Sequence, residues 1–142
     1  MGKYRSAHHR GPDDRAPTHQ YWIRKPYEAT FGYCRAVRVG DTIHVAGTCA
    51  PAGNEAADTY TQTQAAIAVI ASALTQADAS LRDVVRTVVY VKDIADAPDV
   101  ARAHAQAFGE IRPASTMVQV VAMLRPWHRV EIEAYAITGA RL

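Results

Sequence analysis

The 142-residue sequence predicts one α+β domain with the element order β-β-α-β-α-β-β, in which two helices cover one face of a mixed sheet. Residues 84–91 form a near-continuous β-branched run, which is typical of a strand covered on both sides. Residues 58–77 and 98–108 carry apolar side chains at helical spacing, and residues 130–136 alternate between apolar and other side chains. Because two helices cover only one face of a sheet, we expect the other face to meet solvent or another chain.

The first 26 residues have many charges and prolines and almost no periodic apolar pattern, so they predict an N-terminal extension that is flexible or docked. Three apolar residues near its end could dock it: Tyr21, Trp22 and Ile23. The extension contains three histidines, His8, His9 and His19, which raise the hypothesis of a metal site. No cysteine or second pair of ligands at a set spacing accompanies them, so we expect no metal. A single folded domain is then expected over residues 27–142.

Regular structure is expected to begin near Gly32 with a β-hairpin. Residues 33–39 and 42–46 flank Gly40-Asp41, a two-residue loop that suits a tight hairpin. This register places Tyr33 opposite Thr48, so that their side chains share a face.

The same register offsets the two cysteines of the chain. Cys34 lies opposite Gly47 and not opposite Cys49, so a disulfide would require backbone distortion. We therefore expect two free thiols, and inert packing rather than catalysis, since neither has an adjacent histidine or helix N-terminus.

Asp58 is expected to cap a helix that runs to about Ala77 and lies on the sheet through one apolar stripe, with Gln62 outside that stripe. A second helix is expected from about Pro98 to Phe108, ended by Gly109. Its inward face is predicted to comprise Val100, Ala101, His104, Ala107 and Phe108. A histidine on such a face is more often a half-buried structural residue than a catalyst.

Two strands are expected to close the sheet, over residues 117–124 and 130–136, with a turn at 125–129 between them. In the last strand Glu131 and Glu133 stand on one face, about 6.6 Å apart. They could simply meet water, as polar stripes on antiparallel sheets commonly do.

A family resemblance favours a functional role for these carboxylates. From about Phe31 onward the chain resembles the Rid family, also called YjgF/YER057c/UK114 or L-PSP endoribonuclease. The resemblance rests on Pro113-Ala114 before a strand, on Val130-Glu131-Ile132-Glu133-Ala134, and on the strand that follows Asp83. It implies a chorismate-mutase-like fold and a homotrimer with pockets in the clefts between subunits.

The resemblance also implies chemistry without metal or organic cofactor. Members of the best-known branch hydrolyse reactive 2-enamines and 2-imines, with an arginine of a Pro-Ala-Arg motif clamping the substrate carboxylate. It assigns catalysis to Glu131 and substrate binding to Tyr33, Gly47, Thr48, Phe108, Pro113, Ser115 and Thr116.

This chain departs from the pattern where the arginine is expected, because that position is Ser115. An expected serine is Ala46 and an expected asparagine is Ala101. Losing the arginine fork predicts weakened or altered activity on 2-iminocarboxylates, unless Arg112 or Arg35 substitutes.

Three functions therefore remain open: a cofactor-free hydrolase or deaminase acting on a small imine or enamine, a non-catalytic small-ligand-binding trimer, and a ribonuclease. A net charge of +2 and the lack of an aromatic ladder disfavour nucleic acid as a partner. No apolar run approaches the roughly 20 residues that span a bilayer, and no secretory signal begins the chain, so we expect a cytoplasmic protein without a membrane partner. A covalent role for Ser115 would need a nearby base, and the spacing of His104 and His128 predicts no contact with it.

Overall fold

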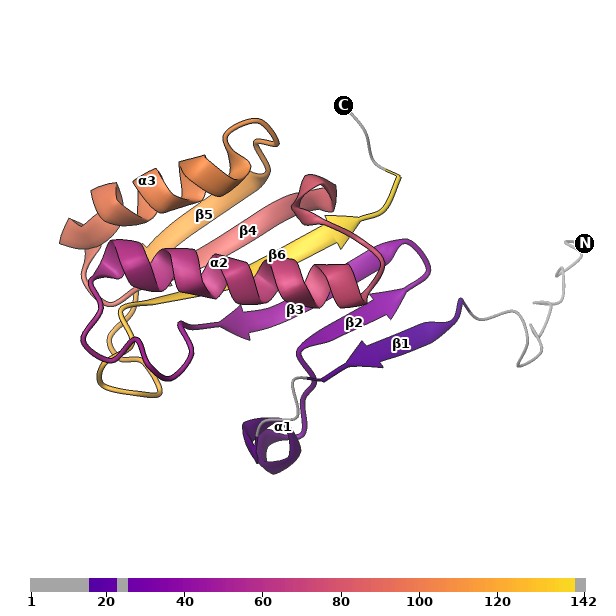
Figure 1. Ribbon diagram of the computed structural model, residues 1–142, viewed down its shortest axis with the longest axis horizontal. Helices are drawn as coiled ribbons and strands as arrows, with labels where there is room; N and C mark the ends of the chain where they lie inside the picture. The colour runs from indigo at the N-terminus through magenta and orange to yellow at the C-terminus, as the bar shows by residue number, and fades with distance from the viewer. Residues whose placement is uncertain (1–15, 23–25, 140–142) are drawn as a thin grey trace, which may run out of the picture.

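The computed structural model describes residues 16–22 and 26–139, and shows the predicted α+β architecture. Helices α2 (Thr59–Gln76) and α3 (Ala97–Phe108) lie on one face of a six-stranded sheet (Figure 1). The strands follow the spatial order β1-β2-β3-β6-β4-β5. Their bounds are β1 Thr18–Tyr21, β2 Ala36–Val39, β3 Thr42–Thr48, β4 Val84–Val91, β5 Ala114–Gln119 and β6 Val130–Ile137. Neighbouring strands are antiparallel except β4 and β5, which are parallel, so the sheet is mixed as expected.

Two elements precede the point at which regular structure was expected to begin. Strand β1 pairs antiparallel with β2, and helix α1 (Pro26–Phe31) follows it. The expectation of a start near Gly32 was therefore wrong. The sequence of β1, Thr-His-Gln-Tyr, has no apolar alternation to reveal it, because three of its four side chains are exposed. His8 and His9 lie outside the described residues, whereas His19 belongs to β1.

The predicted hairpin is present, and Val39 pairs with Thr42 across the Gly40-Asp41 loop. Its first strand is shorter than expected, because β2 begins at Ala36 and the backbone N–H of Tyr33 instead donates to the carbonyl of Glu28 in α1. Both cysteines are free thiols.

Helix α2 begins where the sequence predicted, since the Asp58 side chain accepts a hydrogen bond from the Thr61 N–H. The placement of Gln62 outside the buried stripe was wrong. Its side chain has no exposed surface, and it donates to the carbonyls of Ala57 and Trp127 and accepts from the Arg129 N–H. Gln62 thereby ties the loop before β6 to the helix.

Helix α3 packs beside α2, and Val100 and Phe108 of its inward face are buried, as expected. The expected burial of Ala101 was wrong, because that residue is exposed and Ala103 is buried instead. Helix α3 connects the parallel strands β4 and β5, following the usual crossover between parallel neighbours.

Strand β5 begins and ends earlier than the apolar run 117–124 suggested. Its pairing with β4 starts at Ala114 and stops at Gln119, so the Pro-Ala-Ser segment leads directly into the strand. The later apolar residues Val121 and Leu124 lie in an exposed loop, with 105% and 72% of their surface accessible. Strand β5 is the outer edge of the sheet beyond β4.

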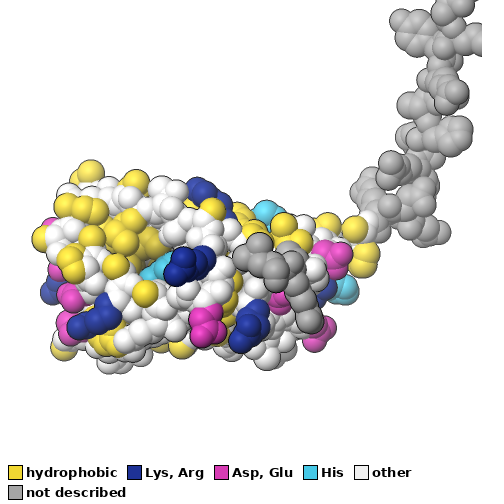
Figure 2. All heavy atoms as spheres, turned by 90° about the horizontal axis from the view of Figure 1, so that it is seen from above, with side chains coloured by type: hydrophobic (Ala, Val, Ile, Leu, Met, Phe, Trp, Pro, Cys, Tyr) yellow, Lys and Arg dark blue, Asp and Glu magenta, His cyan; other side chains and the backbone are white. Residues whose placement is uncertain are grey.

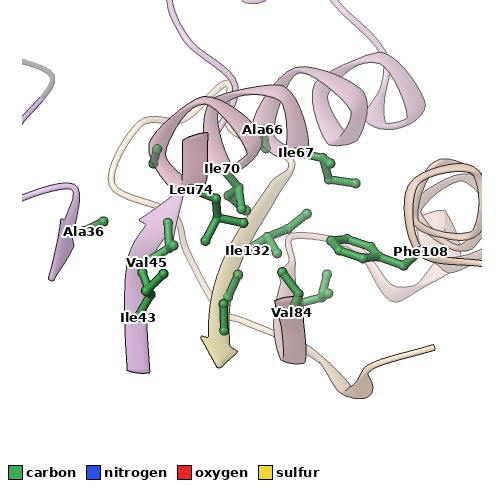
Figure 3. Close-up of a cluster of buried hydrophobic side chains, with 14 of the residues drawn as sticks. Ala36, Ile43, Val45, Ala66, Ile67, Ile70, Leu74, Val84, Phe108 and Ile132 are labelled. Carbon is green, nitrogen blue, oxygen red and sulfur yellow. The ribbon is translucent and has the colours of Figure 1, made fainter. Parts of the chain in front are cut away.

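The core lies between α2, α3 and the sheet. Figure 3 shows Ile70 and Leu74 of α2 and Phe108 of α3 directed toward Ile132 of β6. The predicted alternation in β6 is confirmed, because four alternate residues have no exposed surface: Val130, Ile132, Ala134 and Ala136. The residues between them, from Glu131 to Tyr135, therefore stand on the sheet face that no helix covers.

No helix of the described residues is long and apolar enough to cross a membrane. On the face seen in Figure 2, the Lys and Arg side chains of the described residues are scattered among acidic and apolar ones and form no continuous basic patch.

Candidate functional site

The Glu131 carboxylate lies over a backbone irregularity in the neighbouring strand. Strand β3 pairs with β6 at Val45–Ala134 and next at Thr48–Ile132, so β3 has one extra residue in this stretch. Gly47 falls within the irregularity, and a Cβ atom built on it would collide with Glu131 Oε1. Only glycine leaves room for the carboxylate at this place.

Arg35, which lies just before β2, makes hydrogen bonds to the other predicted residues at this end of β3, including Thr48, which is buried and paired with Ile132. Its Nη1 donates to Thr48 Oγ1 at 2.7 Å and to the Gly47 carbonyl at 3.0 Å. Its Nη2 makes a longer bond of 3.3 Å to the Tyr33 hydroxyl, and its Nε is buried without a hydrogen-bond partner. The Nε and Nη2 groups form one edge of the guanidinium fork, and that edge is barely used within the described chain.

Glu131 is half-buried and makes no hydrogen bond to a described residue. Desolvation, followed by repulsion from Glu133, raises the pKa of the Glu131 carboxyl above its ordinary value, while the nearby Arg35 lowers it. A carboxyl with these properties can hold a proton nearer neutrality than a solvated one, which suits acid–base chemistry.

Cys49 lies on the same side of the sheet but is a poor nucleophile. Burial, and then the charge of Glu131, raise the pKa of the Cys49 thiol to about 12. The thiol therefore stays protonated at neutral pH, in agreement with inert packing.

Glu133 has a different environment from Glu131. Its Oε1 accepts a hydrogen bond of 2.5 Å from the Tyr90 hydroxyl, and its Oε2 accepts one of 2.6 Å from Tyr135. Both carboxylate oxygens are thus occupied, whereas those of Glu131 are free to meet a ligand.

The remaining predicted residues lie around β5. Ser115 and Thr116 are exposed, Pro113 is half-buried just before the strand, and Phe108 is buried in the core at 1% exposure. Thr116 Oγ1 accepts a hydrogen bond from Arg86.

The two groups of residues do not meet within one chain. Thr116 pairs with Val88 and Glu131 with Tyr90, so Thr116 and Glu131 share the uncovered face. They are two strand spacings apart and offset by two residues along the strands, about 12 Å in all. Ser115 pairs with the buried Thr87 and therefore lies on the opposite, helix-covered face. A pocket that contains both Ser115 and Glu131 requires a second copy of the chain.

The sequence indicated Arg35 only as a substitute cation, and it gave no sign of Thr87 or of the bonds from Tyr90 and Tyr135 to Glu133. Arg112 lies before β5, where its Nε donates to the Gly109 carbonyl. The described residues contain no group of three or more histidine, cysteine, aspartate or glutamate side chains that could hold a metal ion.

Comparison with known proteins places this geometry in a family. The family model described as Endoribonuclease L-PSP matches residues 23–138. A crystal structure from Mycobacterium tuberculosis, a member of the YjgF/YER057c/UK114 family, is 43% identical and superimposes with a TM-score of 0.81, covering 86% of this chain and 100% of that one.

Two further relatives carry functional or family names. The 3-aminoacrylate deaminase RutC of Acinetobacter baylyi is 30% identical over 108 residues, which are 73% of this chain and 85% of that protein. The crystal structure of RidA from the Antarctic bacterium Psychrobacter is 28% identical with a TM-score of 0.68, covering 74% of this chain and 87% of that one.

Proposed function

Because this chain belongs to the Endoribonuclease L-PSP family, which includes the YjgF/YER057c/UK114 proteins, we propose that it is a cofactor-free hydrolase that deaminates a small enamine or imine. The observation that carries the proposal is the Glu131 carboxylate, half-buried over Gly47 with no hydrogen-bond partner among the described residues. The 30% identity to a 3-aminoacrylate deaminase supports the same class of substrate.

Enamine hydrolysis moves a proton four times, and Glu131 is suited to each transfer. A proton is added to the enamine carbon, water then adds to the resulting iminium carbon, and ammonia leaves as the carbonyl forms. Protonated Glu131 would supply the first proton, and its carboxylate would then take one from the attacking water and pass it to the departing nitrogen. As ammonia leaves, the carboxylate would take the hydroxyl proton of the forming carbonyl, which restores protonated Glu131. The raised pKa of Glu131 increases the protonated fraction at neutral pH.

Arg35 supplies the positive charge for an anionic substrate. Its Nη1 is held by Thr48 and Gly47, and its Nη2 has only the long bond to Tyr33. A substrate carboxylate bound to Nη2 would lie on the Glu131 side of the cleft instead of at position 115. We therefore expect preferences among carboxylate-bearing enamines that differ from those of enzymes with the Pro-Ala-Arg arginine.

The pocket is proposed to form between copies in a homotrimer. The uncovered sheet face, the exposed Val121 and Leu124 beyond β5, and the separation of Ser115 from Glu131 all support such an assembly. Tyr33, Gly47 and Glu131 of one copy would then face Pro113, Ser115 and Thr116 of the next, with the buried Thr48 bonded to Arg35. Sedimentation should give three times the 15.5 kDa chain mass, and a monomer at micromolar concentration would refute both the trimer and the shared pocket.

The test of the chemistry generates 2-aminoacrylate or 3-aminoacrylate in the cuvette and follows ammonia release above the spontaneous rate. Glu131→Gln should lower turnover by about 10²–10⁴-fold while keeping the assembly. Glu133→Gln is the matched control and should lower turnover less, because both oxygens of Glu133 are bonded to tyrosines. Equal losses in the two variants, or unchanged turnover in Glu131→Gln, would refute the role of Glu131; ligand binding without turnover would support a binding protein instead.

A further inference from the structure

A second group of polar side chains lies on the other face of the sheet, and none of its members moves a proton in the proposed enamine chemistry. Thr87 Oγ1 of β4 is 2.8 Å from Ser115 Oγ of β5 and 2.9 Å from His104 Nε2 of α3. Thr87 has no exposed surface, whereas Ser115 is exposed. A surface hydroxyl is thus joined to an imidazole through one buried hydroxyl, and the sequence spacing gave no sign of this contact.

The local structure fixes all three residues. Thr87 and Ser115 are direct partners in the parallel β4–β5 pair, so their side chains share a face. His104 stands on the third turn of α3, and its ring packs against Phe108 with a centroid separation of 4.6 Å. Phe108 is itself buried at 1% exposure, so the imidazole is held against the core and directed at Thr87.

The hydrogen bonds of this group admit two arrangements. With the proton of neutral His104 on Nδ1, Thr87 donates to Nε2 and its oxygen accepts from Ser115. With the proton on Nε2, the imidazole donates to Thr87 and Thr87 donates to Ser115. The two arrangements differ by the concerted shift of protons along Ser115, Thr87 and His104, which is the property of a proton relay. His104 Nδ1 has no hydrogen bond to a described residue and is not fully buried, so it can exchange protons with solvent.

We propose that Ser115 is a nucleophile for small acyl compounds such as esters, activated by His104 through the Thr87 hydroxyl. Ser115 Oγ forms a bond to the acyl carbon while its proton passes to Thr87 Oγ1 and the Thr87 proton passes to His104 Nε2. The ester C–O bond then breaks, and the leaving oxygen takes a proton from Thr87, which is replenished by His104. Water attacks the acyl-serine with its proton following the same route, so that an acid and an alcohol are released and the three residues return to their first state.

His104 is suited to the role of base at neutral pH. Burial lowers the pKa of its imidazole below the ordinary value of 6.5, and no charged group of the described residues contributes to this shift. The neutral form therefore dominates above pH 6.5. The relay uses none of the groups that move protons in the proposed deaminase, because Glu131 of the same chain lies on the opposite face of the sheet. Ser115 itself would line the shared cleft of that proposal as well.

The test measures labelling of the full-length protein by an alkyl fluorophosphonate, which bonds to an activated serine oxygen with loss of fluoride. Peptide mass mapping should find the adduct on Ser115, with the exposed Ser72 of α2 as the internal control serine. The labelling rate should be constant at neutral pH and fall as His104 becomes protonated below pH 6.5. Ser115 labelled no faster than Ser72 would overturn the proposal.

Three variants examine the relay. Thr87→Val removes the hydroxyl at nearly constant volume and should slow labelling of Ser115 by at least about tenfold, whereas Thr87→Ser should restore it. His104→Gln should slow labelling similarly and abolish its dependence on pH below 6.5, a result that a purely structural histidine would not give. If Thr87→Val fails to fold, the half-buried His104→Gln decides the question, and wild-type labelling with an unchanged pH profile in that variant refutes the relay.

Discussion

The Glu131 carboxylate occupies the space that a side chain at residue 47 would need, because a Cβ on Gly47 would collide with Glu131 Oε1. Gly47→Ala should therefore displace the carboxylate, which is the movable end of a flexible side chain, and should lower enamine turnover with little loss of thermal stability. The double variant Gly47→Ala/Glu131→Gln should be no slower than Glu131→Gln alone, since both changes remove the same group. Additive losses in the double variant would show that Gly47 acts through something other than Glu131.

The raised pKa of Glu131 makes a prediction about stability. A carboxyl whose pKa is higher in the folded state binds more protons when folded, so its contribution to stability is present below its unfolded pKa of about 4.5 and is lost as the pH rises through the folded pKa. The difference in free energy of unfolding between wild type and Glu131→Gln should therefore shift in favour of the variant as the pH rises above 4.5. Urea unfolding at pH 4 and pH 7 measures this difference, and a difference independent of pH would contradict it.

Tyr90 should show its bond to Glu133 in alkaline solution. The hydrogen bond to the Glu133 carboxylate, with some desolvation, raises the pKa of Tyr90 from 10 to about 12. A tyrosine with a raised folded-state pKa contributes stability that is fully present below pH 10 and is lost as the pH rises through about 12. Tyr90→Phe should thus be less stable than wild type at neutral pH by about 1 kcal/mol, and less so above pH 10. Ultraviolet titration should lose one late-titrating phenol in the variant; loss of a phenol that titrates near pH 10 instead would count against the bond.

The sequence predicted those parts of the fold that depend on local periodicity. The alternation of β6, the Asp58 cap of α2 and the Gly40-Asp41 hairpin each follow from neighbouring residues, and each is present. Strand β1 could not be found in this way, because its polar side chains leave no pattern: it is held by backbone pairing with β2, and of its four side chains Tyr21 packs against the core.

For the candidate site too, the sequence predicted what depends on neighbouring residues and missed what depends on distant ones. Glu131 was predicted from its strand, but its relation to Arg35 depends on the β3 irregularity, and the contact of Ser115 with Thr87 depends on a parallel register set by residues 28 positions apart. The burial of Gln62 was missed for a similar reason. Its partners Trp127 and Arg129 are backbone groups more than 60 residues away, and a polar residue with such partners is buried against its ordinary preference.

Gln62 therefore gives a strong stability prediction. Gln62→Leu would leave the Arg129 N–H and the carbonyls of Trp127 and Ala57 without their partner, at a cost of about 3 kcal/mol in the free energy of unfolding. The exposed Gln76 at the end of the same helix is the matched control, and Gln76→Leu should change stability by less than about 0.5 kcal/mol. Equal effects in urea unfolding would mean that the Gln62 bonds contribute nothing.

The separation of Ser115 from Glu131 allows a complementation experiment. Ser115→Trp should fill the proposed cleft, and Glu131→Gln should remove its acid, so each variant alone should be nearly inactive as a deaminase. If each cleft takes one side from each of two copies, refolding a 1:1 mixture should restore about a quarter of the wild-type clefts. No recovery of ammonia release after mixed refolding, with trimers present, would place the whole site within one copy.

Strand β1 has a consequence for the behaviour of the chain in crowded solution. The outermost strand of an open sheet offers unpaired amides and carbonyls to any neighbouring extended chain, which is how fibrils grow. In this sheet the edge strand is β1, Thr-His-Gln-Tyr, and its exposed polar side chains are poorly suited to form a dry interface between stacked sheets. The more apolar strand β2, Ala-Val-Arg-Val, is its inner neighbour. Strand β1 thus covers the backbone edge of β2. A chain shortened past Tyr21 would expose that edge of β2 as a template for aggregation.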